Sequence, residues 1–320
     1  MELDRMKELV ALLNQAGRAY YQEDREIMSN REYDALYDEL VELERRTGIT
    51  LADSPTIHVG YEVVSELKKE VHNTPMLSLD KTKDVEALAA WLGDQEGLLS
   101  WKMDGLTVVL TYRDGELQKA VTRGNGEIGE VITNNARTFR NIPGRIPYTG
   151  ELVVRGEAVI KYSDFEKINA GIEDVEARYK NPRNLCSGTV RQLNNQITAE
   201  RNVYFFAFNL VEVEDVDFHN SMEQRFLWLR RLGFDVVEYE RVNRQTIRDA
   251  VQGFASRIRD NDFPSDGLVL LYDDIAYGKS LGVTAKYPRD SIAFKWADEL
   301  AVTHLREIEW SPSRTGLINP

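Results

Sequence analysis

The sequence has one cysteine and only four histidines among its 320 residues. A single cysteine, Cys186, cannot form a disulfide within the chain. Because no histidine lies near it in the sequence, Cys186 is more typical of a small buried residue than of a nucleophile. The four histidines are scattered and lack the spacing of zinc ligands. We therefore expect neither an internal disulfide nor a metal held by these side chains.

Long apolar runs are also missing. No stretch approaches the roughly 20 apolar residues that span a bilayer, and the N-terminal segment MELDRMKELV is charged from its second residue. These absences argue against a membrane span and a signal peptide, so we expect a cytoplasmic protein with no membrane partner. Hydrophobic residues make up 42% of the chain, which is enough for a sizeable core.

Net positive charge is absent too, since the formal net charge is −13. Such a chain repels phosphate backbones, and we expect it to hold nucleic acid only weakly on its own. One stretch differs. Residues 178–199 contain no acidic side chain but include Arg178, Lys180, Arg183 and Arg191. Taken alone, this stretch is typical of a solvated loop.

The first fifty residues predict a helical hairpin. Apolar residues recur at helical spacing over residues 3–20 and again over 33–43. Ser29 and Glu32 have the spacing of a capping box at the start of the second helix, and Gly48 is placed to end it.

From residue 97 onward the pattern changes to short β-branched runs. Residues 106–113 and 116–124 predict two antiparallel strands joined by a turn at Asp114 and Gly115. Strands are also expected at 151–160, 203–213, 266–272, 291–296 and 301–310. Helices are expected at 162–169, 221–232 and 244–259. This order predicts an α+β domain rather than a doubly wound sheet.

The tetrapeptide KMDG at residues 102–105 resembles the KxDG motif of the covalent nucleotidyltransferases, which include DNA ligases, RNA ligases and capping enzymes. By itself this match is weak. It is followed, in the motif order of that superfamily, by RGNG at 123–126, VRGE at 154–157, DGLVL at 266–270 and AFKW at 293–296. The resemblance rests on all five motifs occurring in this order, not on any one of them.

Further stretches resemble the NAD-dependent DNA ligases of bacteria. They are HNTPMLSLD at 72–80, RGNGEIGE at 123–130, NPRN at 181–184, VRQL at 190–193, and the hairpin segments AYYQED and REYDALYDEL. The resemblance implies a helical domain that binds the nicotinamide mononucleotide half of NAD (1–68). It also implies an ATP-grasp-like nucleotidyltransferase domain of antiparallel sheets flanked by helices (69–312). Residues 313–320 resemble the start of an OB-fold that is missing here.

The chemistry expected from this resemblance is self-adenylation, with NAD as the donor and Mg²⁺ as the cofactor. A lysine attacks phosphorus only when it is neutral, and Lys102 is the candidate. The α-phosphate gains charge during attack, so cations should surround it, and Arg123, Arg183 and Lys295 suit this role. The resemblance assigns the carboxylates of Asp104 and Glu157 to orienting the ribose and positioning the lysine or the metal.

The resemblance also implies residues that bind the two halves of NAD. Phe208 falls where the family stacks an aromatic ring on adenine, although on its own a phenylalanine there is more typical of a core residue. The resemblance also places Ser78, Leu79 and Ser100 among the positions that bind NAD. The nicotinamide positions fall on Tyr20, Tyr21, Tyr33 and Asp34, yet tyrosines on the apolar face of a helix are also typical of a core.

Five positions depart from the family pattern. Leu271 replaces a lysine, Ser100 a glutamate that binds the adenine amine, Asn125 and Asn30 aspartates, and Asp290 a tryptophan. Losing a charge-assisted contact commonly costs about 1.5 to 3 kcal/mol. Three hypotheses follow: a divergent but active monomeric module of a ligase that seals nicked DNA, a related enzyme with another donor or acceptor, and a noncatalytic nucleotide-binding protein.

Overall fold

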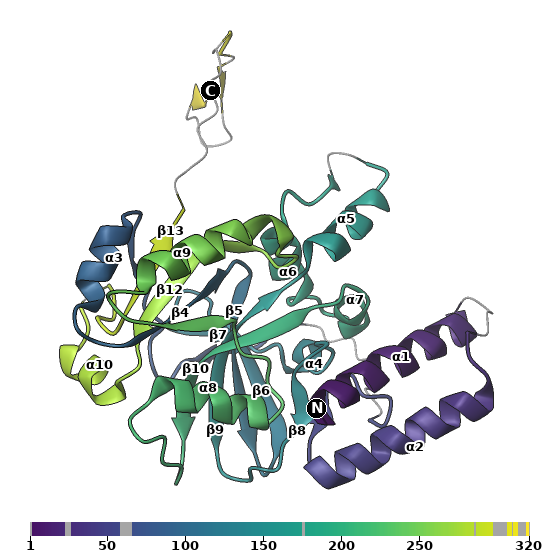
Figure 1. Ribbon diagram of the computed structural model, residues 1–320. Coiled ribbons are helices and arrows are strands. Elements are labelled where there is room, and N and C mark those ends of the chain that lie inside the picture. The colour runs from purple at the N-terminus through teal and green to yellow at the C-terminus, as the bar shows by residue number, and fades with distance from the viewer. Residues whose placement is uncertain are drawn as a thin grey trace.

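The computed structural model describes residues 2–22, 27–57, 66–174, 177–284, 286–296, 306–308, 310–312 and 318–319. In these ranges the chain forms a two-helix hairpin beside a larger α+β body that contains two large sheets (Figure 1). No helix within them combines the length and the apolar character needed to cross a lipid bilayer.

The hairpin consists of α1 (Glu2–Gln22) and α2 (Asn30–Thr47). The predicted capping box is present at α2: the Ser29 hydroxyl accepts a hydrogen bond from the Glu32 backbone, and the Glu32 carboxylate accepts one from the Ser29 backbone. Gly48 ends the helix in the left-handed conformation, with φ 66°. The two apolar stripes form a core of their own, made of Met6, Leu9, Val10, Leu13, Leu40, Leu43, Ile49 and Leu51.

The larger sheet has six strands in the order β1-β8-β6-β5-β9-β10, and all neighbouring pairs are antiparallel. Asp114 and Gly115, both with positive φ, form the predicted turn between β5 and β6. The strands are β1 (Thr50–Leu51), β5 (Leu106–Arg113), β6 (Glu116–Thr122), β8 (Pro143–Arg145), β9 (Leu152–Val159) and β10 (Tyr204–Val213).

The second sheet has five strands in the order β11-β4-β12-β13-β3; its β13–β3 pair is parallel and the others are antiparallel. Its strands are β3 (Asp80–Thr82), β4 (Gly97–Met103), β11 (Tyr239–Val242), β12 (Ser265–Tyr272) and β13 (Ser291–Lys295). Two short pairs accompany the sheets: β2 (Lys69–Val71) with β7 (Ile128–Glu130), and β14 (Ser311–Pro312) with β15 (Ile318–Asn319).

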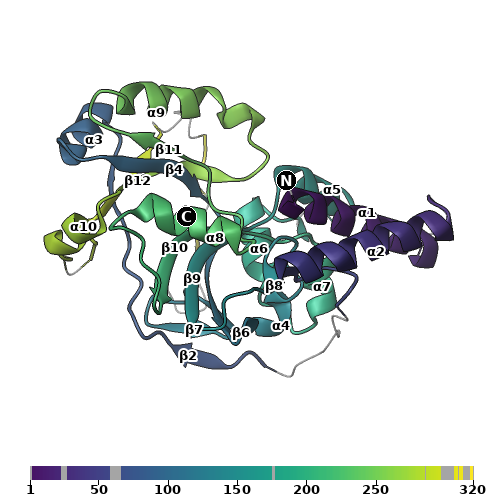
Figure 2. The same ribbon diagram turned by 60° about the horizontal axis from the view of Figure 1, so that its bottom comes forward.

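Helices α3 (Val85–Leu92) and α9 (Ile247–Ser256) cover the outer face of the five-stranded sheet (Figures 1 and 2). Because side chains alternate along a strand, Leu99 and Trp101 of β4 face these helices, while Ser100 and Lys102 face the opposite side. The other helices are α4 (Thr133–Ala136), α5 (Tyr162–Ala170), α6 (Pro182–Thr189), α7 (Asn195–Glu200), α8 (Met222–Arg231), the 3₁₀ turn η2 (Ile258–Asp260) and α10 (Ile275–Leu281).

The base of the hairpin is joined to the larger body. Strand β1 follows α2 and pairs with β8. The Asn14 amide donates to the carbonyl of Asp53 at 2.8 Å, and Lys7 forms an ion pair with Asp235. The other end of the hairpin, where α1 ends and α2 begins, projects away from both sheets (Figures 1 and 2).

Most predicted elements are present, and the differences are local. The predicted fold class, α+β with antiparallel sheets flanked by helices, is confirmed. Strand β4 was missed, because its residues alternate poorly between polar and apolar types. The strand expected at 301–310 lies mostly outside the described residues, and its described positions 306–308 and 310 are not in a strand.

Candidate active site

Two lysines share one carboxylate at the end of the five-stranded sheet. Lys102 of β4 and Lys295 of β13 both pair with Gly267 of the strand between them. The Nζ atom of Lys102 lies 2.8 Å from Oδ1 of Asp266, and that of Lys295 lies 2.9 Å from Oδ2. Burial alone would raise the pKa of Asp266, but the hydrogen bonds from the two lysines outweigh it and lower that pKa. Asp266 therefore stays ionised and holds both lysines in place.

The turn after Lys102 brings in a second carboxylate, that of Glu157 on β9. It accepts hydrogen bonds from the backbone N–H of Gly105 at 3.1 Å and from the Thr107 hydroxyl at 2.8 Å. Only glycine fits at position 105, because a Cβ there would lie 2.0 Å from the Ala158 carbonyl oxygen. Burial raises the pKa of Glu157 to about 7, against the opposing effect of its hydrogen bonds.

Asp104 and Arg183 form an ion pair next to these groups. Nη1 of Arg183 lies 2.7 Å from Oδ1 of Asp104. Arg183 belongs to the first turn of α6, which Asn181 caps with its side chain. The hydrogen bond to Asp104 raises the pKa of Arg183, and the charges of Glu157 and Asp266 act in the same direction. The NPRN stretch is thus a capped helix start that carries a cation to the site, not a solvated loop.

Arg123 occupies the turn after β6. It donates to the Met76 carbonyl at 3.3 Å and to the Ser78 hydroxyl at 3.2 Å. The side-chain oxygen of Asn125 accepts hydrogen bonds from the backbone N–H groups of residues 127 and 128, at 3.0 and 2.8 Å. An aspartate oxygen accepts the same bonds, so RGNG retains the turn geometry of the RGDG pattern.

Two of the departures from the family pattern lie on the sheet face that carries Lys102. Ser100 is 4% exposed, and its hydroxyl donates to the Val269 carbonyl at 3.4 Å. Leu271 pairs with Leu98 and packs against the main core. Neither side chain brings a charge to this face.

The other residues expected to bind NAD in the larger body are only half-buried. Phe208 is half-buried at a bulge of β10, where the register shifts between Ala207 and Asn209, and it packs against the main core. Leu79 is half-buried immediately before β3.

The expected nicotinamide-binding residues lie toward the projecting end of the hairpin. Tyr20 and Tyr21 belong to the last turn of α1 and Asp34 to α2, and their side chains lie outside the described part of the structure, as does that of Asn30. Tyr33 is half-buried against the hairpin core, and its ring stacks on that of Tyr37 with 6.4 Å between centroids.

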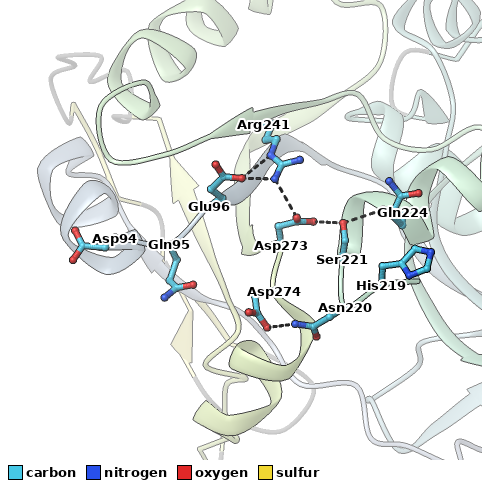
Figure 3. A pocket seen from close by; sticks show the side chains of 10 residues that line it. All are labelled: Asp94, Gln95, Glu96, His219, Asn220, Ser221, Gln224, Arg241, Asp273 and Asp274. Carbon is cyan, nitrogen blue, oxygen red and sulfur yellow. Dashed lines mark hydrogen bonds and ion pairs between the residues drawn. The ribbon is translucent and has the colours of Figure 1, made fainter. Parts of the chain in front are cut away.

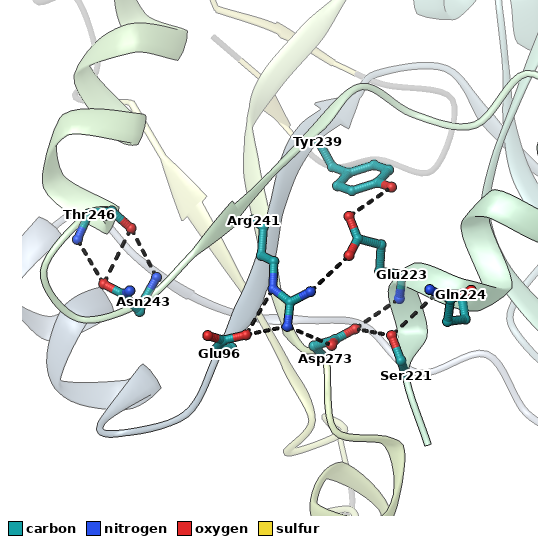
Figure 4. Close-up of polar contacts among 9 residues, drawn as sticks. All are labelled: Glu96, Ser221, Glu223, Gln224, Tyr239, Arg241, Asn243, Thr246 and Asp273. Atoms are coloured by element: carbon teal, nitrogen blue, oxygen red, sulfur yellow. Dashed lines mark hydrogen bonds and ion pairs between the residues drawn. The ribbon is translucent and has the colours of Figure 1, made fainter. Parts of the chain in front are cut away.

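A cavity of about 650 Å³ lies at the other end of β4 and β12, away from Lys102 (Figure 3). In it Arg241 forms ion pairs with Glu96, with Glu223 at 3.0 Å and with Asp273 at 3.6 Å (Figure 4). Asp273 also accepts a hydrogen bond from Ser221, the residue that caps α8. None of the expected site residues lines this cavity. The bonds of Arg241, Asp273 and Ser221 link the five-stranded sheet to the start of α8.

Sequence reasoning missed Asp266 as a site residue. The DGLVL motif that begins with Asp266 was the available signal, but the sequence indicated only its place in the motif order and a strand. The pairing of β12 between β4 and β13 is what places its carboxylate between two lysines. The structure therefore groups Lys102, Asp104, Glu157, Arg183, Asp266 and Lys295.

Comparison with known proteins identifies the family. Residues 64–299 match the NAD-dependent DNA ligase adenylation domain, and residues 2–60 match the DNA ligase-like, N-terminal NAD+-binding domain. Proteins named DNA ligase from Ruminiclostridium cellulolyticum and Lachnoclostridium phytofermentans are 64% and 65% identical, over 98% and 99% of this chain. One from Shouchella clausii is 37% identical over 99% of this chain.

The chain spans about half the length of the curated relatives it matches: 48% of each of the first two and 49% of the third. The two matched domains follow one another over nearly all of its residues. By these matches, and by the motif order of its sequence, the chain belongs to the NAD-dependent DNA ligases.

Proposed function

We propose that this chain is the adenylating module of an NAD-dependent DNA ligase and that Lys102 is its nucleophile. The observation that carries the proposal is the shared Asp266 carboxylate, which holds Lys102 and Lys295 side by side at 2.8 and 2.9 Å. Such an arrangement places one amine for attack and leaves a second cation beside it for the phosphate.

In the proposed reaction, the neutral amine of Lys102 attacks the α-phosphorus of NAD. An N–P bond forms, the P–O bond to nicotinamide mononucleotide breaks, and nicotinamide mononucleotide departs with the electron pair. Asp266, with its lowered pKa, is a poor proton acceptor. It therefore orients the amine, and the lysine proton passes to solvent. AMP remains on Lys102 as a phosphoramidate.

The surrounding residues have proposed roles in this step. Lys295, Arg183 and Arg123 stabilise the charge that builds on the phosphate oxygens. Glu157 binds the ribose, and Asp104 fixes the position of Arg183 through their ion pair at 2.7 Å. Phe208, Ser78, Leu79 and Ser100 contact the adenosine half.

We further propose that residues 1–68 form the domain for the nicotinamide half, with Tyr20, Tyr21, Tyr33 and Asp34 in contact with it, and that residues 69–312 form the adenylation domain. Residues 313–320 are assigned to the start of an OB-fold. Because the nicotinamide residues lie toward the projecting end of the hairpin, both domains act on one NAD molecule only after that end approaches Lys102.

Mg²⁺ is proposed as the cofactor. The nearby carboxylates are already bonded: Asp266 to two lysines, Asp104 to Arg183, and Glu157 to Gly105 and Thr107. These residues suit an ion held mainly by substrate phosphates and water rather than by a protein cage. Bound in that way, Mg²⁺ would neutralise phosphate charge.

For the whole protein we propose transfer of AMP from Lys102 to the 5′-phosphate of nicked DNA, followed by sealing of the nick. The family to which the chain belongs supports this proposal. A cytoplasmic, monomeric protein is also proposed; the net charge of −13 is consistent with it.

The test is intact-protein mass spectrometry after incubation with NAD and Mg²⁺, beside parallel incubations with ATP and with Lys102→Ala. We expect one added adenylate from NAD alone, absent from the variant. Retention of the adduct by Lys102→Ala would assign the nucleophile elsewhere.

A second function is favoured by the side chains at Leu271 and Ser100, which bring no charge to the nucleotide face. In this alternative the protein is a nucleotidyltransferase with another donor or acceptor, or binds nucleotide without reacting. An adduct from ATP would support the first form. No adduct from either donor, in a folded protein, would support the second.

A further inference from the structure

Arg155 lies on the same strand and the same face as Glu157. On β9 the buried residues Val154 and Gly156 alternate with half-buried Arg155 and Glu157, so the latter two point to one side of the six-stranded sheet. The strand neighbours of Arg155 are Val109 on β5 and Asn209 on β10. Arg155 therefore stands two residues along the strand from a proposed site residue.

The side chain of Arg155 is half-buried and has no partner among the described residues. Its Nε atom is shielded from solvent and makes no hydrogen bond. Within the described residues no hydrogen bond or ion pair involves any atom of this side chain. Nearby Arg183 and Arg191, by contrast, each bond to a carboxylate, Asp104 and Glu130. A half-buried cation without a counterion is unfavourable, so a partner from outside the chain is expected to satisfy it.

A second arginine, Arg123, also has no carboxylate partner among the described residues. Among the described residues, the Arg123 guanidinium donates to two neutral groups, the Met76 carbonyl and the Ser78 hydroxyl. The backbone places Arg123 close to Arg155: the Arg123 N–H donates to the Thr107 carbonyl at 2.9 Å, and Thr107 pairs with Glu157, two residues from Arg155 on β9. Burial lowers the pKa of Arg155, and the positive charge of Arg123 lowers it further. In a chain with 53 acidic residues, two adjacent arginines without a carboxylate partner form a site for an anion carrying more than one charge.

We propose that Arg155, together with Arg123, binds a phosphate group of a substrate. Arginine suits this ligand because its planar fork donates two parallel hydrogen bonds to phosphate oxygens. The phosphate comes either from the nicotinamide side of NAD or from the 5′ end of the DNA strand. The identity of the two candidate substrates rests on the proposed function. The existence of an anion site at Arg155 does not.

The experiment compares Arg155→Gln with Arg155→Lys and with Arg231→Gln, a control that neutralises an exposed arginine in α8. One arm measures the rate of adenylation from NAD at low concentration. The other measures the affinity for nicked duplex with a 5′-phosphate or a 5′-hydroxyl, by fluorescence anisotropy at low salt. Thermal unfolding without ligand is recorded for each variant.

If NAD supplies the phosphate, Arg155→Gln lowers kcat/KM for adenylation about tenfold or more. If DNA supplies it, Arg155→Gln abolishes the preference for the 5′-phosphate and leaves adenylation unchanged. In either case unliganded Arg155→Gln unfolds at the same temperature as wild type or a higher one, because an unpaired, partly buried charge has been removed. Arg155→Lys keeps the charge and therefore loses less activity or affinity than Arg155→Gln.

Two results would overturn the proposal. One is wild-type behaviour of Arg155→Gln in both arms. The other is an equal loss of activity or DNA affinity in Arg155→Gln and Arg155→Lys, together with a lower unfolding temperature of both. That result would mean that Arg155 only packs the sheet. Failure of wild-type protein to react with NAD would refute the proposed function instead, since the DNA arm measures phosphate binding without adenylation.

Discussion

Glu157 couples the stability of the fold to pH. Its pKa is about 7 in the folded protein, against an ordinary value of 4.5, because burial disfavours the ionised form. Between these two pH values the folded state binds more protons than the unfolded state. The contribution of Glu157 is therefore fully present below pH 4.5 and is lost as the pH rises through about 7.

Glu157→Gln removes this titration. We expect the stability of the variant, relative to wild type, to rise by at most about 3 kcal/mol between roughly pH 5 and 8. Urea unfolding at several pH values measures the difference. Glu212→Gln, at an exposed position of the neighbouring β10, is the control and should follow wild type. Parallel curves for wild type and Glu157→Gln would contradict the assignment.

At single positions, the sequence predicted residue types better than their partners. The motif order singled out Lys102, Asp104 and Glu157, which the structure groups together. It did not indicate Asp266 as the link between two lysines, because that role depends on strands distant in sequence. Arg155 gave no signal either: within VRGE nothing distinguishes a paired arginine from an unpaired one.

At the scale of elements, the KMDG turn depends on close contact between β5 and β9. A Cβ at Gly105 would lie 2.0 Å from the Ala158 carbonyl oxygen, and backbone cannot yield as a flexible side chain can. We expect Gly105→Ala to destabilise the protein by about 1 to 3 kcal/mol and to lower adenylation at least tenfold, since the Gly105 N–H also holds Glu157.

Gly253 in α9 provides the matched control, because a Cβ there meets nothing within 4 Å. Gly253→Ala should stabilise the protein by about 0.5 to 1 kcal/mol through helix propensity and leave adenylation unchanged. Thermal unfolding and the mass-spectrometric assay measure both effects. Equal stability losses in the two variants would show that the close contact at Gly105 is not the cause.

Elements with strong local signals were predicted, whereas β4 and α6 were not. The capping box at Ser29, the turn at Asp114 and strand β5 all follow from short-range chemistry. Strand β4 is buried on both faces, and helix α6 lies in a polar stretch of the sequence. Both depend on packing against strands that are distant in the sequence. Lys102 was therefore expected before a strand, although it lies within one.

At the scale of the whole molecule, charge limits contact with nucleic acid. The chain carries a formal charge of −13, and many of its arginines are already held by carboxylates, as Arg191 is by Glu130. We expect this chain to bind nicked duplex with a Kd on the order of 10⁻⁵ M or weaker at physiological salt. Anisotropy titrations over a range of salt concentrations measure this affinity. A nanomolar Kd would contradict this expectation and would mean that the chain has a positively charged surface for DNA despite its ion pairs.

The two domains must also move if the proposed function is correct. The hairpin is anchored at its base through β1 and the Lys7–Asp235 ion pair, while its other end projects from the sheets (Figure 1). We expect NAD to draw that end toward Lys102. The motion can be measured in Lys102→Ala, which binds NAD without reacting.

Because the single cysteine, Cys186, is fully buried, introduced cysteines can be labelled selectively. A probe pair at Asp38→Cys on α2 and Lys167→Cys on α5, both exposed, reports the distance between hairpin and body. We expect this distance to change when NAD binds, while a pair at Lys167→Cys and Arg231→Cys, both within the body, stays constant. If saturating NAD leaves the first distance unchanged, the hairpin does not close, and the nicotinamide half must be bound by residues of the body alone.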